Sequence, residues 1–542
     1  MRRLLSLIFV SVALAADLIV DLPDGTIRGS EITYDNKSYY AYRGIPFAAP
    51  PLGKLRFQAP VPPQPWDGVL DTNATRSCCI SMTPSIEEAG LEDEDCLYLN
   101  VYTPPRKITE KLPVMVWIYG GGFSTGCISD VTSGPFFLLD QDLVIVYINY
   151  RVGLYGFLST QDDVVLGNAG LKDQLLAMKW TKNNIALFGG DPEKITLFGG
   201  SAGGISVGAH VVNKKSAGLY RAAICQSGCS LTYMDITNPK DPKQAAYDYA
   251  KYIDPTISEK NTTTEIRDFL QSVPADVLTP AYNVNSQTGI VIETEHEDAY
   301  VTNRSFPLLE SGNFIQVPLI LGTSSAEALT FFAFMGGVPL ITAIGLTYDL
   351  NPSGLLPWDL ELLPGANVTE VGSIIKEAYV GPNGSFTENL AAVVELVSDQ
   401  MFLKSTLKQA EIQSNFTPVY LYQFSFEGFL TLFLPNIEGT GRAGHGEESP
   451  YLFATMPLLT DREVLISKQM VKLWANFAKT LNPTPDASDP LFNLTWPQVT
   501  PTNIQYLDFD DQIAVKPNRK AKEMAMWNYV YYTYGQQPFK GF

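Results

Sequence analysis

Two nearly continuous apolar runs stand out in the first third of the chain, LPVMVWIY (112–119) and DLVIVYINY (142–150). Runs of this length between Gly, Asp and Pro residues are typical of strands buried on both faces of a sheet. A segment with helical periodicity (170–188) follows, and then come two further short runs, KITLF (194–198) and RAAICQSG (221–228). Strands that alternate with helices predict an α/β fold built on a mostly parallel sheet.

Elsewhere the pattern is weaker. The first hundred residues carry short β-like runs such as LIVDLPDGTIRG, and 235–310 appears polar and irregular. A short strand, VPLILG, is predicted at 317–322, whereas 330–440 appears helical, without clear strands. No repeat or linker interrupts the chain, so we expect a single domain over 16–542 with helical insertions.

The N-terminus has the layout of a secretory signal peptide over residues 1–15. Arg2 and Arg3 precede an apolar stretch, and Ala13 and Ala15 form a small-residue cleavage site. No later apolar run long enough to span a bilayer and no C-terminal anchor or retention signal are recognised. We therefore expect a secreted, extracellular protein without a membrane anchor.

The net charge of the chain excludes some classes of binding partner. A formal charge of −19 and a pI near 4.7 argue against binding to nucleic acids and to anionic membranes. Secretion agrees with six cysteines, whose pairing the spacing leaves open, and with eight N-glycosylation sequons. The sequons are at Asn36, Asn73, Asn261, Asn303, Asn367, Asn383, Asn415 and Asn493.

The Gly-x-Ser-x-Gly pattern of serine hydrolases occurs three times, at Ser124, Ser201 and Ser206. A nucleophile of this kind requires a sharp turn between a strand and a helix. Only Ser201 has a strand before it and a helical pattern after it. Ser206 falls inside that helix and Ser124 is followed by turn residues, so Ser201 is the candidate nucleophile.

Gly120-Gly121-Gly122 follows the strand predicted at 112–119. Acyl transfer needs backbone N–H donors directed at the developing oxyanion, and a glycine-rich loop at a strand end can supply them. We expect the amides of Gly121, Gly122 and Ala202 to form this oxyanion hole.

The chain has three histidines from which to choose a general base. His210 lies too far along the helix after Ser201, and His296 is surrounded by carboxylates. His445, in a glycine-rich loop, fits the chain order of serine, acid and histidine. Glu327 follows the strand at 317–322 through a short loop and is the favoured acid, although the pattern alone leaves other carboxylates open.

With these residues in place, the chain resembles the type-B carboxylesterase and cholinesterase family of α/β-hydrolases. The likeness covers nearly the whole mature chain, and softer matches point to secreted arthropod esterases. It rests on YRGIPFAAPPLGKLRF (42–57), EDCLYLNVYTP (94–104), VMVWIYGGGF (114–123), INYRVGLYGFLS (148–159), GNAGLKDQ (167–174), FGGDPEKITLFGGSAGG (188–204) and WANFAKTLNP (474–483).

The resemblance implies an α/β-hydrolase fold, in which helices flank a large, mostly parallel sheet. It also implies a Ser201–Glu327–His445 triad, an oxyanion hole at Gly121, Gly122 and Ala202, and no metal or other cofactor. It pairs Cys96 with Cys78 or, preferably, Cys79, and it matches Arg43 and Glu94 to a salt bridge of the family.

Two departures bear on the substrate. Gly200 stands before the nucleophile, where many relatives carry Glu and juvenile-hormone esterases tend to carry Gln. The loop between Cys79 and Cys96 has no aromatic residue on which a quaternary ammonium would stack. The departures argue against choline esters and against a juvenile-hormone role. The expected partner is a small-molecule substrate, an uncharged carboxylic ester.

Three other readings remain open. Some relatives in this fold are inactive adhesion or binding proteins, which usually lack a triad residue and carry a membrane anchor. A slow esterase that sequesters toxicants would use the same site. A true lipase would need a long apolar lid, which the short polar loop at 79–96 does not supply. The oligomeric state is left open, as is the pairing of Cys127, Cys225 and Cys229.

Overall fold

The structure is a computed structural model that describes residues 18–82, 90–105, 111–130, 133–232, 241–285, 289–455, 457–518 and 520–542. The predicted signal peptide, residues 1–15, lies outside these ranges.

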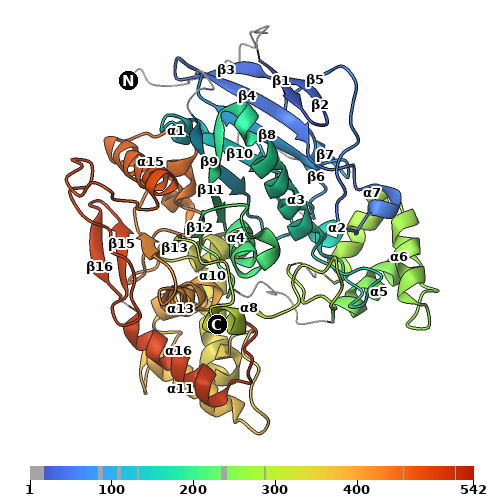
Figure 1. The fold of residues 1–542 in the computed structure, drawn as a ribbon. Coiled ribbons are helices and arrows are strands. Elements are labelled where there is room, and N and C mark those ends of the chain that lie inside the picture. The colour runs from blue at the N-terminus through green and yellow to red at the C-terminus, as the bar shows by residue number, and fades with distance from the viewer. Residues whose placement is uncertain are drawn as a thin grey trace.

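An eleven-stranded mixed sheet forms the centre of the molecule (Figure 1). Seven neighbouring strands in its middle, β10, β9, β11, β12, β13, β14 and β15, run parallel to one another. Antiparallel strands extend the sheet at both edges. In order across the sheet they are β16 (Ala514–Pro517), β15 (Gln505–Phe509), β14 (Val419–Phe424), β13 (Leu319–Ser324), β12 (Ala222–Gln226), β11 (Gly190–Gly200), β9 (Leu112–Ile118), β10 (Val144–Ile148), β8 (Tyr98–Thr103), β4 (Lys37–Pro46) and β3 (Ser30–Tyr34).

Two small sheets lie outside the central one. One consists of β1 (Ile19–Leu22), β2 (Gly25–Arg28) and β5 (Val69–Asp71), and the other of β6 (Cys78–Cys79) and β7 (Glu92–Asp93).

The apolar runs of the sequence form the middle of the central sheet. Every residue of β9 and β10 is buried, as expected of strands that are covered on both faces. The strands predicted from 194–198, 221–228 and 317–322 correspond to β11, β12 and β13. The predicted α/β class with a mostly parallel sheet is confirmed.

Helices flank the sheet; in the view of Figure 1, α3 and α4 lie in front of its strands. Those longer than six residues are α3 (Ala169–Asn184), α4 (Ala202–Val212), α5 (Pro242–Ile253), α6 (Thr263–Ser272), α9 (Ala328–Met335), α10 (Gly337–Leu350), α11 (Val368–Val380), α12 (Leu390–Ser398), α13 (Lys404–Gln413), α15 (Asp461–Thr480) and α16 (Ala521–Tyr534). The shorter ones are α1 (Phe136–Leu139), α2 (Gly153–Phe157), α7 (Ala275–Leu278), α8 (Ser305–Glu310) and α14 (Ser449–Leu452).

Two segments depart from the sequence-based expectation. The segment 235–310, predicted to be irregular, contains α5 and α6, which form a second, smaller core together with α2 and α7. Local signals for both helices are present. Asp241 caps α5 ahead of Pro242, and Thr262 with Glu265 makes a capping box on α6.

The segment 330–440 was expected to lack strands, yet it contributes β14, which lies between β13 and β15. All six of its residues are buried. A short, fully buried run such as VYLYQF has no polar alternation, and periodicity does not distinguish it from a helical segment.

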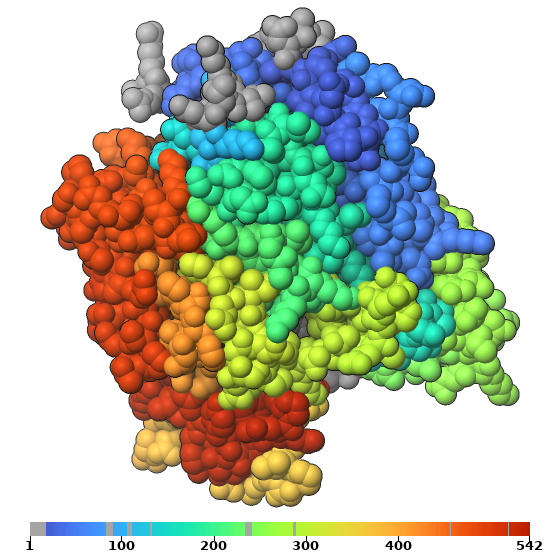
Figure 2. All heavy atoms as spheres, in the orientation of Figure 1, coloured from blue at the N-terminus to red at the C-terminus, as the bar shows by residue number. Residues whose placement is uncertain are grey.

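The N-terminal and C-terminal parts of the chain lie at opposite ends of the molecule. Figure 2 shows the N-terminal strands at one end and the C-terminal helix at the opposite end. There α16 packs beside α11 (Figure 1).

Candidate active site

Ser201 lies at the turn between β11 and α4. Its backbone has φ 57° and ψ −126°, a conformation rarely adopted by a residue with a Cβ atom. The N–H of Ser201 donates to the carbonyl of Gln226 at the end of β12, over 2.8 Å. A Cβ atom on Gly203 would lie 2.0 Å from the carbonyl oxygen of Ile118, so glycine here allows α4 to begin directly against β9. The serine is thus held in a strained turn at the carboxyl edge of the sheet.

The glycine loop after β9 lies against this serine. A Cβ atom on Gly120 would come within 2.9 Å of Cβ of Ser201. Gly121 has φ 106° and Gly122 has φ 60°, and a Cβ atom on Gly121 would lie 2.3 Å from the carbonyl oxygen of Thr125. This backbone course requires glycine and brings the loop to the nucleophile.

Glu327 and His445, 118 residues apart in sequence, are joined by a hydrogen bond of 2.6 Å between Oε2 and Nδ1. Glu327 is fully buried just beyond β13, and the side chain of His445 is 13% exposed. Because β11 and β13 run parallel in one sheet, Ser201 and Glu327 follow strand ends at the same edge. The loop after β14 brings His445 to that edge.

Backbone hydrogen bonds hold the histidine loop to the acid. The N–H of Ala326 donates to the backbone carbonyl of Ala443 over 2.9 Å, and the N–H of His445 donates to the backbone carbonyl of Glu327 over 3.3 Å. The hydroxyl of Thr330 donates to the carbonyl of His445 over 3.1 Å. These contacts fix the loop on both sides of the imidazole.

Aromatic rings surround the imidazole. The ring of Phe402 stacks on that of His445 with centroids 4.6 Å apart, and Phe331 packs at 5.0 Å. Of the apolar residues that follow the acid in α9, Leu329 and Phe332 are buried in the core, whereas Phe331 contacts the histidine. The imidazole therefore has little freedom to rotate.

Ser227 belongs to this site, although the sequence analysis did not identify it. Its hydroxyl donates to Oε1 of Glu327 over 2.6 Å, and the N–H of Ser324 donates to the same oxygen over 2.7 Å. The sequence offers one indication of this role, because Ser227 directly follows β12. That strand lies between β11, which precedes Ser201, and β13, which precedes Glu327.

A second carboxyl group, that of Glu448, is buried close to Glu327. Burial and the negative charge of Glu327 raise the pKa of Glu448. One of its oxygens accepts a 3.4 Å hydrogen bond from Gln226, and the other has no partner among the described residues. A raised pKa favours the neutral acid, which limits the negative charge beside Glu327.

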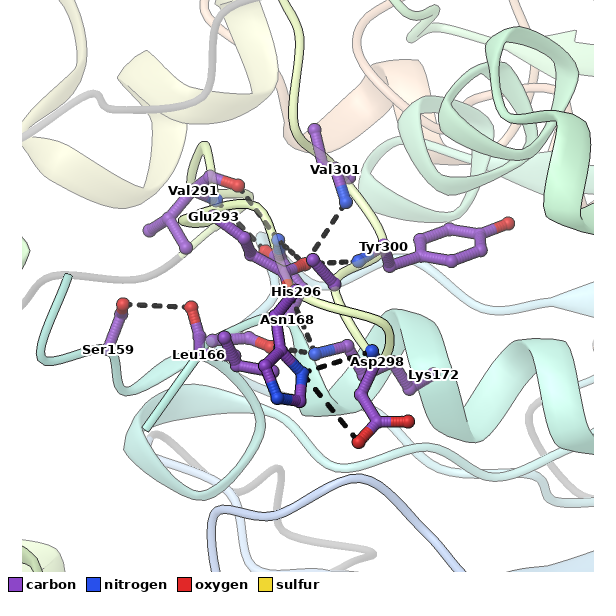
Figure 3. A network of polar contacts seen from close by, with 12 residues as sticks. Ser159, Leu166, Asn168, Lys172, Val291, Glu293, His296, Asp298, Tyr300 and Val301 are labelled. Carbon is purple, nitrogen blue, oxygen red and sulfur yellow. Dashed lines mark hydrogen bonds and ion pairs between the residues drawn. The ribbon is translucent and has the colours of Figure 1, made fainter. Parts of the chain in front are cut away.

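The other two histidines lie apart from the triad candidates. His210 is fully buried on α4, between the hydroxyl of Tyr300 at 2.6 Å and Oε1 of Gln174 at 2.9 Å. Burial lowers its pKa to about 3, so the ring is neutral. His296 is exposed, and its ring lies beside the carboxylate of Asp298 (Figure 3). These placements agree with the sequence analysis, which set His210 aside for its distance from Ser201 along the helix and His296 for the carboxylates around it.

Figure 3 also shows how the loop around His296 is attached. Glu293 is buried and accepts from Lys172 over 2.7 Å and from Asn168 over 2.6 Å. Lys172 and Asn168 lie at the start of α3, so this polar network fixes the loop to a helix of the central layer.

The two remaining candidate serines take part in packing. Ser206 is buried in α4 and accepts a hydrogen bond from Gln174 over 3.1 Å. Ser124 lies in a turn and donates to the carbonyl of Gly121 over 3.1 Å. Neither follows a strand and begins a helix, as Ser201 does.

Two disulfides connect the loops near this edge. Cys79 is bonded to Cys96, the preferred pairing implied by the resemblance, and Cys78 is bonded to Cys127. Cys225 and Cys229 are buried free thiols.

The expected salt bridge between Arg43 and Glu94 is wrong. Arg43 instead pairs with Asp130 at 2.9 Å, and Glu94 pairs with Arg56. Arg56 donates to the carboxylate of Glu94 from Nε, over 2.7 Å, and from Nη2, while its Nη1 donates to backbone carbonyls at the end of α6. Arg56 therefore ties the loop before β8 to the second core, a contact that no local pattern reveals.

The model of the carboxylesterase family matches residues 16–527. The chain belongs to the carboxylesterase family. It is a carboxylic-ester hydrolase of type B with the α/β-hydrolase fold.

Its relatives include mammalian and insect enzymes. The chain is 34% identical to an acylcarnitine hydrolase from Mus musculus, over 93% of this chain and 89% of that one. It is 31% identical to a juvenile hormone esterase from Tribolium castaneum, over 87% and 84% of the two chains. The structure of juvenile hormone esterase from Manduca sexta, with OTFP covalently attached, matches with a TM-score of 0.81. It has 30% identity and covers 95% of this chain and 99% of the other.

Proposed function

We propose that this carboxylesterase is a secreted enzyme that hydrolyses uncharged carboxylic esters through an acyl-enzyme intermediate on Ser201. The observation that carries the proposal is the 2.6 Å hydrogen bond between Glu327 and His445 at the sheet edge that also bears Ser201. A buried carboxylate bonded to Nδ1 leaves Nε2 of the imidazole to accept a proton.

In the first half of the reaction, Nε2 of His445 takes the proton of the Ser201 hydroxyl as Oγ attacks the ester carbonyl. The amides of Gly121, Gly122 and Ala202 bind the oxyanion. The tetrahedral intermediate collapses, and the alcohol leaves with the proton from His445. Glu327 orients the imidazole and stabilises its cationic form.

In the second half, His445 removes a proton from water, which attacks the acyl carbonyl. Collapse of the second intermediate releases the acid and returns the proton to Ser201. All proton transfers in this scheme use the protein's own side chains, with no metal or other cofactor.

An uncharged ester is favoured by the surroundings of the histidine, where Phe331 and Phe402 present apolar surface. The absence of aromatic residues between Cys79 and Cys96 argues against quaternary ammonium substrates. The proposed substrate class is therefore an uncharged carboxylic ester.

Secretion is supported by the apolar N-terminal segment after Arg2 and Arg3. The two disulfides agree with an oxidising compartment. Of the eight sequon asparagines, seven are exposed and Asn261 is partly exposed, so all are at the surface, where glycosylation takes place.

The test is labelling with a fluorophosphonate, followed by peptide mapping, on the wild type and Ser201→Ala. We expect an adduct on the Ser201 peptide that the substitution abolishes. Ser206→Ala is the matched control, because it changes a neighbouring serine of the same motif and should leave labelling intact. An unlabelled wild type that is folded and glycosylated would contradict the proposal and favour an inactive binding protein.

A further inference from the structure

The surface around α9 and α10 is unusual in this acidic protein. From Ala328 to Tyr348 the chain has no charged residue, and the two helices are separated by a sharp bend of 108°. Gly336 and Gly337, with φ 144° and 64°, make that bend. Within the described residues no single helix is long and apolar enough to cross a membrane, but this bent pair meets that test jointly.

The outer face of the pair is apolar and exposed. Phe334 is 86% exposed and Met335 is 69% exposed, both at the bend. Along α10, Val338, Leu346 and Leu350 are exposed at helical spacing, whereas Ile341 and Gly345 face inward. Large apolar side chains grouped in this way are uncommon on a monomer and mark a binding surface.

A second apolar element lies close to the first. The 3-10 helix η7 (Leu430–Phe433) exposes Leu432 by 76% and Phe433 by 67%, within an uncharged run from Gly428 to Ile437. A Cβ atom on Gly444 would contact both Thr330 in α9, at 2.3 Å, and Leu434 just after η7, at 2.7 Å. Both apolar elements therefore flank the loop that carries His445.

The charges at the margin of α10 are turned away from solvent. Asp349 forms an ion pair with Lys376 at 2.8 Å and accepts hydrogen bonds from Phe386 and Thr387. The carboxylate at the end of α10 is thus already paired, so a neutral lipid would not have to desolvate it. Beside η7, the exposed carboxylates of Glu427 and Glu438 lie outside the uncharged run, one before it and one after it.

We propose that α9, the start of α10 and η7 form a docking surface for a neutral lipid phase, such as a zwitterionic bilayer or an emulsion droplet. The tip residues Phe334, Met335, Leu432 and Phe433 would enter the interface, so that esters dissolved in the lipid reach the site directly. The substrate part of this inference rests on the proposed function, and the docking part does not.

Three observations favour lipid over a protein partner. The surface is uncharged, although the whole chain has a net charge of −19. Its most exposed side chains lie at a helix bend and in a single short turn, a shape suited to shallow insertion. It also adjoins Glu327 and His445, and the esters expected there are apolar.

The direct test is sedimentation with phosphatidylcholine vesicles. The probe variants are Phe334→Ser/Met335→Ser and Leu432→Ser/Phe433→Ser. The matched control is Val69→Ser/Leu187→Ser. It alters exposed apolar residues of β5, in the small three-stranded sheet, and of the 3-10 helix Ile185–Phe188, which precedes β11, whereas Ser201 follows the other end of that strand. We expect the vesicle partition coefficient to fall at least about tenfold in each probe variant and to stay unchanged in the control.

Two further measurements separate the alternatives. Hydrolysis of p-nitrophenyl acetate in solution should be equal in all variants, whereas hydrolysis of a long-chain ester embedded in the vesicles should fall with the partition coefficient. Adding phosphatidylserine should weaken binding, because the negative vesicles would repel a protein whose net charge is −19.

The docking proposal is overturned if the wild type does not sediment with vesicles, or if probe and control variants sediment equally. A wild-type dimer that the probe substitutions convert to monomer, with no vesicle binding, would identify the surface as a contact between copies. An enzyme that binds vesicles but fails to cleave p-nitrophenyl acetate would refute the proposed function and leave the docking surface in place.

Discussion

The hydroxyl of Ser227 donates to Oε1 of Glu327, and Nδ1 of His445 contacts the other carboxylate oxygen, each at 2.6 Å. The acid is therefore held at both oxygens, one of which also accepts the N–H of Ser324. A carboxylate held in this way cannot rotate away from the imidazole, and its charge is stabilised in a fully buried position.

Substitution Ser227→Ala should lower kcat for a short-chain ester by about 10-fold, because a hydrogen bond to a charged group is lost while the Ser324 amide remains. KM should change little, since Ser227 contacts the acid rather than the proposed acyl site. The measurement is steady-state kinetics at several pH values. Ser227→Thr, which keeps a hydroxyl, is the matched control, and an equal loss in both variants would show that packing, not the hydrogen bond, matters.

Replacing Glu327 by Gln should have a larger effect. The amide keeps the size of the side chain but removes the charge that stabilises the imidazolium, so we expect kcat to fall by about 10³–10⁴-fold. Fluorophosphonate labelling should slow in parallel, and unchanged thermal unfolding would show that the fold is intact. A loss of less than tenfold would point to another carboxylate, with Glu448 the nearest candidate in this buried cluster.

Sequence patterns predict best those parts of the molecule that depend on local order. The runs that form β9, β10 and β11 are long or are followed by glycine turns, and Ser201 is recognisable because its strand and helix are adjacent in sequence. In contrast, β14 is a six-residue buried run without alternation, and its place between β13 and β15 follows from tertiary packing.

The contacts around the acid depend on tertiary structure in the same way. Ser227, Glu327 and Glu448 come together from three segments, and no spacing rule links them. The exchange of the expected Arg43–Glu94 pair for Arg43–Asp130 and Arg56–Glu94 has the same origin, because the partners are 87 and 38 residues apart in sequence and only the fold brings them together.

The two disulfides should differ in their contribution to stability. Cys79–Cys96 spans 17 residues and Cys78–Cys127 spans 49. In the chain-entropy model, removing the disulfide that closes the shorter loop lowers the free energy of unfolding by about 3 kcal/mol. Removing the one that closes the longer loop lowers it by about 1 kcal/mol more. Urea unfolding of Cys79→Ala/Cys96→Ala and Cys78→Ala/Cys127→Ala under non-reducing conditions measures both. Cys225→Ala removes a buried thiol but no bridge and is the control; equal losses for the two pairs would contradict the entropic account.

Glu447 should make stability depend on pH. Burial raises its pKa from the ordinary value of 4.5 to about 7, although the N–H and hydroxyl of Thr431 donate to it. Between these two values the folded protein keeps the proton and the unfolded chain does not, so stability from this group is present below pH 4.5 and is lost as the pH rises through 7. The loss is at most about 3 kcal/mol.

Substitution Glu447→Gln removes this titration and keeps an oxygen to accept from Thr431. We therefore expect the free energy of unfolding of the variant, relative to wild type, to increase between pH 5 and pH 8, as measured by urea unfolding at both values. Glu427→Gln, at an exposed position in the same segment, is the control and should show no such trend. A difference between Glu447→Gln and wild type that is the same at both pH values would show that Glu447 is already ionised in the folded protein at pH 5.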